Sequence, residues 1–263
     1  MCVAVRGALC THATVHHEQL ARKPRGMPFA DAAALVTAGL TAWQMLEAAG
    51  ALSGGGVNRL LITAGGGGVG HYAIQLAKRV AKVRSVVATA SAGKTAFVRR
   101  CGADEVLDYA AASYPAALAD LAADAALDCK GVKCVPAVRP GGIVVSLLGL
   151  PDGATLRAIT AAYHMQPPPC LCCIAGVLTC IARCRSCCSS VRVHNLITLP
   201  HGGELEALAA TCLRSGVVPS VDRVFTLDDA AAALAYVELG HTTGKVLVEV
   251  VDGAVARRPP ERE

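Results

Sequence analysis

The residues with the clearest potential for chemistry are the glycines between positions 65 and 70. Gly65, Gly67 and Gly70 match the pattern G-x-G-x-x-G, and an uncharged apolar run, residues 60–64, precedes them. Apolar residues at helical spacing follow. A flexible loop is the simpler interpretation of a glycine run, but a strand, a glycine turn and a helix in this order are typical of a dinucleotide site. The backbone could then approach a pyrophosphate, whose charge the start of the helix favours.

The end of the second expected strand bears on which dinucleotide would bind. Proteins that bind NAD(H) usually carry an Asp or Glu there, about 20 residues after the glycines, to hold the ribose 2′-hydroxyl. Residues 88–91 read Ala-Thr-Ala-Ser, without a carboxylate, and Lys94 follows. A hydroxyl and an ammonium would suit the added charge of a 2′-phosphate. The sequence therefore predicts NADP(H) over NAD(H), and a solvated Lys94 in the first turn of a helix is the alternative.

Alternating strands and helices surround the glycine motif. The apolar runs predict strands at residues 8–15, 60–64, 85–89, 105–109, 125–129, 143–148, 196–199, 220–225 and 245–251. A helix capped by Asp31 is expected at residues 32–49, and a second helix directly after Gly70. Further helices are expected at residues 94–101, 115–123, 204–214 and 227–239. This alternation predicts an α/β fold built on a right-handed, doubly wound, parallel Rossmann sheet.

Composition narrows the class of protein. The chain has 263 residues, of which 53% are hydrophobic and 17% charged, and this indicates a globular protein. The net charge of +5 is mild, and no basic stripe with interleaved aromatics points to a nucleic-acid partner. No apolar run is long enough to span a membrane. We expect a cytoplasmic protein, with a mitochondrial transit peptide in the arginine-rich residues 1–26 as the alternative.

Thirteen cysteines, seven of them between positions 170 and 188, raise the question of a metal site. The C-x-x-C pairs at residues 170–173 and 184–187 have a spacing that resembles a zinc ribbon. The residues around them are apolar, and the odd count without a secretory signal indicates free thiols in a reducing compartment. The two adjacent histidines at residues 16–17 are expected to lie on the surface and not to bind a metal. The sequence therefore predicts no bound metal.

Six segments resemble the medium-chain dehydrogenase/reductase superfamily, in particular its zinc-free quinone oxidoreductase branch, the zeta-crystallin-like enzymes. They are LARKPRGMPFADAAALVTAGLTAWQML (20–46), ITAGGGGVGHYAIQLAK (62–78), VVATAS (86–91), CGADEVLDY (101–109), RPGGIVVSLLG (139–149) and VFTLDDAAAALAYVELGHTTGKVLVEV (224–250). The resemblance implies a Rossmann domain beside a GroES-like β-barrel. In the cleft between them, hydride would pass from NADPH to a quinone or another activated carbonyl or alkene. A homodimer is possible.

The same resemblance assigns roles to particular residues. The pyrophosphate would lie on Gly65, Gly67, Gly68, Val69 and Gly70, and the 2′-phosphate among Ser91, Lys94 and Tyr109. Thr41 and Gly149 would lie near the nicotinamide, and Lys245 near the cofactor cleft. Ordinary packing is the alternative for Thr41 and Tyr109. No catalytic acid or base is assigned.

The resemblance also implies a division into domains, with one departure from the family. Residues 1–26 would be a remnant of the GroES-like domain, 27–216 the Rossmann NADP-binding domain, 217–251 the return to the GroES-like domain and 252–263 a flexible tail. Most of the barrel that precedes residue 20 in the family has no counterpart, so one wall of the substrate cleft would be missing. We therefore expect an NADPH-dependent reductase with weak turnover or, alternatively, a truncated, non-catalytic NADP-binding or interaction protein.

Overall fold

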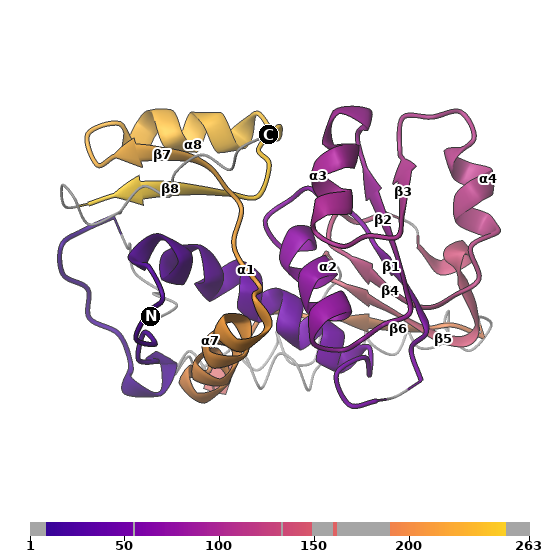
Figure 1. Cartoon of the computed structure of the whole chain (residues 1–263), viewed down its shortest axis with the longest axis horizontal. Helices are drawn as coiled ribbons and strands as arrows, with labels where there is room; N and C mark the ends of the chain where they lie inside the picture. Colours follow the sequence, from indigo (N-terminus) through magenta and orange to yellow (C-terminus); the bar gives the residue numbers. More distant parts are fainter. Residues whose placement is uncertain (1–8, 55, 133, 149–159, 162–189, 251–263) are drawn as a thin grey trace, which may run out of the picture.

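A parallel sheet and a smaller two-stranded unit make up the chain, with helices α1 and α7 between them (Figure 1). The computed structural model describes residues 9–54, 56–132, 134–148, 160–161 and 190–250. Gly149 and the cysteine-rich residues 170–188 therefore lie outside the described residues. In the described part of the chain, no helix is both long and apolar enough to cross a lipid bilayer.

The larger sheet has six strands in the order β3-β2-β1-β4-β5-β6, and all neighbouring strands are parallel. Their bounds are β1 Arg59–Ile62, β2 Ser85–Ala90, β3 Glu105–Asp108, β4 Ala123–Asp128, β5 Val138–Ser146 and β6 Arg192–Asn195. The order reverses between β1 and β4, which is the switch point where doubly wound sheets bind their ligands. This is the Rossmann sheet that the sequence predicts.

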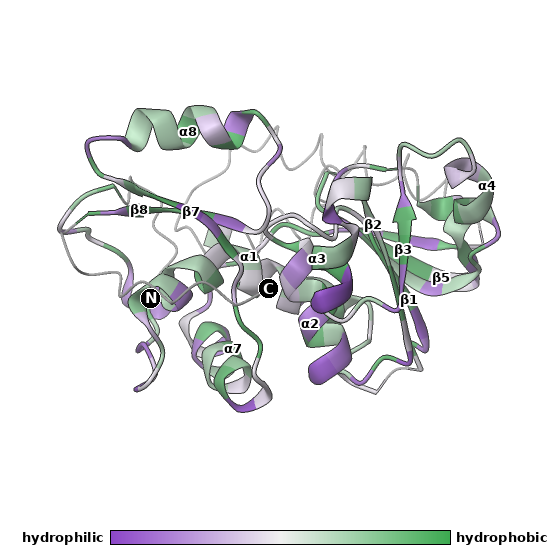
Figure 2. Ribbon diagram, turned by 45° about the horizontal axis from the view of Figure 1, so that its top comes forward, coloured by the Kyte–Doolittle hydropathy of each residue, from purple (hydrophilic) through white to green (hydrophobic). Residues whose placement is uncertain are grey.

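The central strands are apolar because both of their faces are covered. Leu60 and Ile62 of β1 belong to one core cluster with side chains of α1, α2 and α7, whereas Leu61 packs in a second cluster with Leu118 of α4. All three β1 side chains are fully buried. A strand in this position has no solvent face for a polar residue, and Figure 2 accordingly shows hydrophobic colours along the sheet.

Five described helices accompany this sheet. Their bounds are α1 Phe29–Ala48, α2 Gly70–Arg79, α3 Thr95–Arg100, α4 Tyr114–Ala119 and α7 Gly202–Ser215. Helix α1 packs against both α2 and α7, so the longest of the described helices bridges the sheet and the C-terminal part of the chain. Helix α7 ends at Gly216, whose φ of +65° suits a glycine after a helix.

The smaller unit follows the linker at residues 216–220. It consists of β7 Val221–Thr226, α8 Ala230–Glu238 and β8 Lys245–Glu249. The strands β7 and β8 pair in parallel, and α8 packs against both, as the crossover of a β-α-β unit must. Strand β8 begins at Lys245, close to Gly68, and runs away from the larger sheet (Figure 1).

Carboxylates tie the strands together at the amino-terminal edge of the larger sheet. Asp124 accepts the N–H groups of Asn58 and Arg59, at 2.7 Å each, and the Nε–H of Arg139 at 2.6 Å. Burial alone would raise the pKa of Asp124, but the hydrogen bonds from Arg59, Arg139 and Asn58 outweigh it and lower the pKa. Asp124 thus joins the starts of β1 and β4, opposite the edge where a ligand would bind.

Three expected elements differ from the structure. Described residues 9–15 form no strand, and they are mostly exposed, without a neighbouring strand to pair with. The strand expected at 196–199 is instead β6, Arg192–Asn195, because these residues pair with residues 143–146 of β5. Helix α1 begins at Phe29 after the N-cap Pro28, so Asp31 lies in its first turn, where a carboxylate favours the helix dipole without capping it.

Candidate functional site

The glycine loop starts from a strained residue at the end of β1. Ala64 has a left-handed φ of +52°, which is unfavourable for a residue with a β-carbon. Thr89, at the end of β2, supports this bend. Its hydroxyl accepts the N–H of Ala64 at 3.1 Å, and its carbonyl accepts the N–H of Gly65 at 2.8 Å. The turn that leads into α2 is therefore held by the neighbouring strand rather than being a flexible loop.

Two glycines of the motif are needed for packing. A β-carbon on Gly70 would collide with the carbonyl oxygen of Ala64 and would lie 2.8 Å from the α-carbon of Gly65. A β-carbon on Gly65 would lie only 3.0 Å from that of Ala88 and 3.1 Å from Cδ1 of Ile74. Helix α2 can approach β1 this closely only because both positions lack side chains.

Gly67, Gly68 and Gly70 line a cavity of about 250 Å³ at the switch point between β1 and β4. Its walls come from the start of α2, from α1, from the residue after β4 and from β8. The lining residues are Thr37, Ala38, Ala64, Gly67, Gly68, Val69, Gly70, Cys129 and Lys245. No side chain of the N-cap residue Val69 caps α2, and in the first turn the N–H of His71 donates to the carbonyl of Gly67 at 3.2 Å.

Two lysines from distant parts of the chain flank the glycine loop. A β-carbon on Gly68 would lie 3.2 Å from Cδ of Lys245, and burial lowers the pKa of the Lys245 ammonium. A β-carbon on Gly66 would lie 2.8 Å from Cδ of Lys94. The Lys94 ammonium donates to the carbonyl of Thr242 at 2.7 Å, which leaves it two further donors. The loop therefore has a cation on either side, as a site for an anion requires.

His71, in the first turn of α2, contacts both the glycine loop and the chain before β7. Its Nε2 accepts the N–H of Ser220 at 3.2 Å, which assigns the proton to Nδ1, and Nδ1 donates to the carbonyl of Gly67 at 2.9 Å. Burial is the main cause that lowers the pKa of His71 to about 4, and the charge of Lys245 adds to it. The imidazole is thus neutral and fully buried at neutral pH.

Asp128 organises the loop after β4. Its Oδ1 accepts the N–H groups of Lys130, Gly131 and Val132 at 3.1, 2.8 and 3.0 Å, and its Oδ2 accepts the hydroxyl of Ser146 at 3.2 Å. This buried carboxylate is held by hydrogen bonds, so it shapes the loop that places the neighbouring residue, Cys129, in the cavity wall.

The remaining expected site residues lie at the same edge of the sheet or close to it. Ser91 follows β2 and Tyr109 follows β3, and the N–H of Tyr109 donates to the carbonyl of Ala90 at 3.3 Å. Thr41 is buried one turn from Thr37 of the cavity, and its hydroxyl donates to the Thr37 carbonyl at 2.7 Å. Gly149 lies outside the described residues.

Sequence reasoning missed four residues that the structure brings to this site. Thr37 and Cys129 line the cavity, His71 supports the glycine loop, and Asp128 holds the loop after β4. Asp128 left a readable signal, a lone acid at the end of an apolar strand. His71 left a weaker one, the four-residue spacing that it shares with Gln75 and Arg79 on one helix face.

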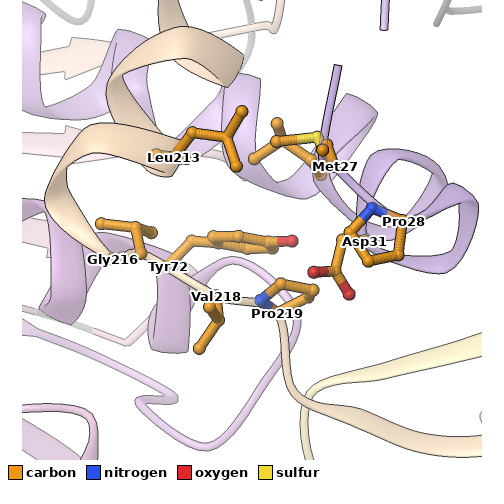
Figure 3. A pocket seen from close by; sticks show the side chains of 12 residues that line it. Met27, Pro28, Asp31, Tyr72, Leu213, Gly216, Val218 and Pro219 are labelled. Carbon is orange, nitrogen blue, oxygen red and sulfur yellow. The ribbon is translucent and has the colours of Figure 1, made fainter. Parts of the chain in front are cut away.

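A second cavity, of about 220 Å³, lies between α1, α2 and α7, and none of the glycine loop lines it (Figure 3). Its wall is formed by Met27, Asp31, Tyr72, Leu213 and Pro219 among others. It is distinct from the cavity at the switch point.

The described residues contain no group of three or more His, Cys, Asp or Glu side chains that could hold a metal ion. The described cysteines at positions 101, 134 and 212 are buried as free thiols, and burial raises the pKa of each. The C-x-x-C pairs lie outside the described residues, so the expectation that they bind no zinc stays a prediction.

The strand order and the glycine turn define the Rossmann class of α/β folds. More narrowly, the chain belongs to the zinc-binding dehydrogenase family, whose sequence profile matches residues 101–248. This agrees with the medium-chain dehydrogenase/reductase resemblance of the sequence.

Three relatives illustrate the family. The chain is 31% identical over 252 residues to 2-methylene-furan-3-one reductase of Solanum lycopersicum, covering 93% of this chain and 53% of the relative. It is 31% identical over 248 residues to NADPH-dependent alkenal/one oxidoreductase, chloroplastic, of Arabidopsis thaliana, covering 92% and 53%. The solved quinone oxidoreductase of Coxiella burnetii aligns with a TM-score of 0.67 and 28% identity, covering 88% of this chain and 63% of that one. The chain thus spans about half the length of the two curated relatives.

We predict that Gly70→Ala destabilises the protein by about 2 kcal/mol or more, because the new methyl group meets backbone atoms that cannot move away. Gly66→Ala is the matched control, since its methyl group would meet only the flexible side chain of Lys94. Urea unfolding measures both. Equal losses in the two variants would contradict this account of Gly70.

We predict that His71 makes stability depend on pH between about 6.5 and about 4. The unfolded histidine takes up a proton in this range, whereas the folded one stays neutral, so the free energy of unfolding falls as pH falls. The loss approaches about 3 kcal/mol at most. Urea unfolding of the wild type and of His71→Gln across this range should give a shallower slope for the variant. His241→Gln, which removes an exposed imidazole, is the control, and parallel slopes for wild type and His71→Gln would refute the prediction.

Proposed function

We propose that this chain binds NADP(H) and transfers hydride from NADPH to a quinone or another activated carbonyl or alkene. The observation that carries the proposal is the pair of lysines, Lys94 and Lys245, on either side of a glycine loop at the switch point of a Rossmann sheet. A dinucleotide phosphate is an anion of the size and charge that such a loop binds through backbone amides.

The proposed contacts follow the order of the strands. The pyrophosphate would lie on residues 65–70, with the uncapped start of α2 and the Lys245 ammonium beside it. The 2′-phosphate would be surrounded by Ser91 and Lys94, which come after β2, and by Tyr109, which comes after β3. The absence of a carboxylate from residues 88–91 supports NADP(H) over NAD(H).

The nicotinamide end would lie beyond the loop, toward Thr41, Gly149 and Lys245. The bound cofactor supplies the hydride, and the protein supplies orientation and exclusion of water. Cys129, Thr37 and Ala38 make this part of the cavity wall partly apolar. We assign no catalytic acid or base.

The acceptor class rests on the relatives. Their names describe a furanone reductase, an alkenal/one oxidoreductase and a quinone oxidoreductase. All three kinds of substrate contain a carbonyl group conjugated to a carbon–carbon double bond, and this conjugated system accepts hydride. We extend this class of small molecule to the present chain, and with it a cytoplasmic or organellar location and a possible homodimer. The assignment of residues 1–26 and 217–251 to a GroES-like domain is likewise a proposal.

Calorimetric titration with NADPH and NADH tests the choice of cofactor. We expect NADPH to bind at least about tenfold more tightly, the value of one added charge-assisted contact. Lys94→Glu should reverse this order because it puts a carboxylate near the ribose. Lys82→Glu makes the same charge change after α2, away from the glycine loop, and should preserve the order. Equal affinities of the wild type for the two cofactors would disprove the NADP(H) assignment.

Oxidation of NADPH in the presence of 1,4-quinones and α,β-unsaturated ketones tests the reaction. We expect turnover that needs both the cofactor and one of these acceptors. Lys245→Met should raise the KM for NADPH by about tenfold, because it removes the ammonium beside the loop. Tight NADPH binding without oxidation by any acceptor would favour the alternative, a non-catalytic NADP-binding protein.

A further inference from the structure

Three polar side chains on one face of α2 bind the backbone of the linker before β7. His71, Gln75 and Arg79 are spaced by four residues, so they project from successive turns of the same helix face. The linker, residues 216–220, connects the end of α7 to β7. Each of the three side chains contacts a different residue of this linker.

The contacts fall on alternate linker residues. The guanidinium of Arg79 donates to the carbonyl of Gly216. The Gln75 amide makes a two-way pair with Val218: its Nε2 donates to the carbonyl at 2.8 Å and its Oε1 accepts the N–H at 3.1 Å. The next contact, one turn earlier in α2, is the bond from the backbone N–H of residue 220 to the imidazole of His71.

The repeat distances of the two segments explain why this pairing works. Four residues of α-helix rise about 6 Å, and two residues of extended chain span about 6.6 Å. A helix face with polar residues at every fourth position can therefore bind every second residue of an antiparallel extended segment. His71 and Gln75 are buried, and buried polar side chains require hydrogen-bond partners. The linker backbone supplies such partners to both side chains.

The end of this ladder reaches the proposed cofactor site. The carbonyl of Ser220 accepts the N–H of Lys245 at 2.8 Å, and the carbonyl of Gly66 accepts the N–H of Gly244 at 3.0 Å. His71 also donates to the carbonyl of Gly67. One imidazole thus joins the glycine loop to the residue that pairs with Lys245.

We propose that His71 is a positioning residue, which holds Lys245 of β8 in register with the glycine loop. In the described chain, the ammonium of Lys245 makes no hydrogen bond to α2. Two contacts hold the start of β8 here: the bond from Gly244 to the Gly66 carbonyl, and the chain of contacts through Ser220 and His71. The linker pairs made by Gln75 and Arg79 extend the same support along α2. The consequence for the cofactor rests on the proposed function: a preorganised ammonium would bind the phosphates at a smaller entropic cost.

Substitutions at His71 can separate its two bonds. In His71→Asn, the side-chain amide nitrogen can replace Nδ1 toward Gly67, but nothing replaces Nε2 toward Ser220. In His71→Gln, the amide can reach the position of Nε2 instead. Lys78→Met is the matched control, because Lys78 lies on the same helix but bonds to Asp104 at 3.0 Å and not to the linker.

The first measurement is amide hydrogen exchange of the full chain without cofactor. We expect His71→Asn to speed exchange at Ser220 and Lys245 by about tenfold or more, the effect of losing one hydrogen bond. His71→Gln should restore protection in part, and Lys78→Met should retain it. Gln75→Met, which removes the pair with Val218, provides a second route if His71→Asn fails to fold, and should also expose Ser220. Wild-type exchange at Lys245 in both folded variants would overturn the proposal.

The second measurement is the Kd for NADPH in a double-mutant cycle with Lys245→Met. If His71 acts through Lys245, His71→Asn weakens binding by about tenfold in the wild type and by less than about twofold in Lys245→Met. The same loss in both backgrounds would overturn the proposal, because it would mean that His71 acts independently of Lys245. A wild type that does not bind NADPH refutes the proposed function alone, and the exchange data then decide the role of His71.

Discussion

The contact between the carbonyl of Ala64 and the backbone of Gly70 is the constraint on which the rest of the structure depends. It lets α2 begin directly against the end of β1, with no side chain between them. The first turn of α2 therefore faces the cavity at the switch point, and the helix runs along the sheet at a fixed distance. The left-handed φ of Ala64 is the local cost of this approach, and Thr89 offsets it with two hydrogen bonds.

The position of α2 in turn determines where the C-terminal unit lies. Helix α2 presents His71 and Gln75 to the linker, and the linker sets the register of β7 and β8. A similar device operates on the other side of α7, where the Gln44 amide of α1 pairs with both backbone groups of Leu199. Side-chain amides thus bind two segments that lie outside the sheets, one around Leu199 before α7 and one around Val218 after it.

Charged side chains serve different purposes at the two edges of the larger sheet. At the amino-terminal edge, Asp104 and Asp124 accept strand N–H groups, and these bonds are structural. At the carboxyl-terminal edge, Lys94 and Lys245 flank a glycine loop, next to a helix N-terminus that is itself partly positive. The backbone amides and ammonium groups at this edge would suit the phosphates of the proposed cofactor.

Some features of the fold and the site could be predicted from local sequence alone. The buried strands 60–64 and 85–89 were predicted because a strand covered on both faces admits only apolar residues. The glycine turn was predicted because the G-x-G-x-x-G pattern follows an apolar run, and the structure leaves no room for a β-carbon at Gly70. The role of Lys94 in a cofactor site stays a prediction. The strand expected at 196–199 was wrong, since pairing with β5, rather than local propensity, places β6 at Arg192–Asn195.

Other features were decided only by tertiary structure. The positions of His71 and Lys245 in the sequence do not predict that both bind Ser220. These contacts depend on the path by which α7 and the linker return across α2. Residues 9–15 have the composition of a strand but no neighbouring strand in the described chain to complete one. The sequence by itself determined the buried strands, through their continuous apolar runs, and the helices, through the helical spacing of their apolar residues. Tertiary structure decided the contacts between segments more than a hundred residues apart, since these depend on the path of the whole chain and leave no local pattern.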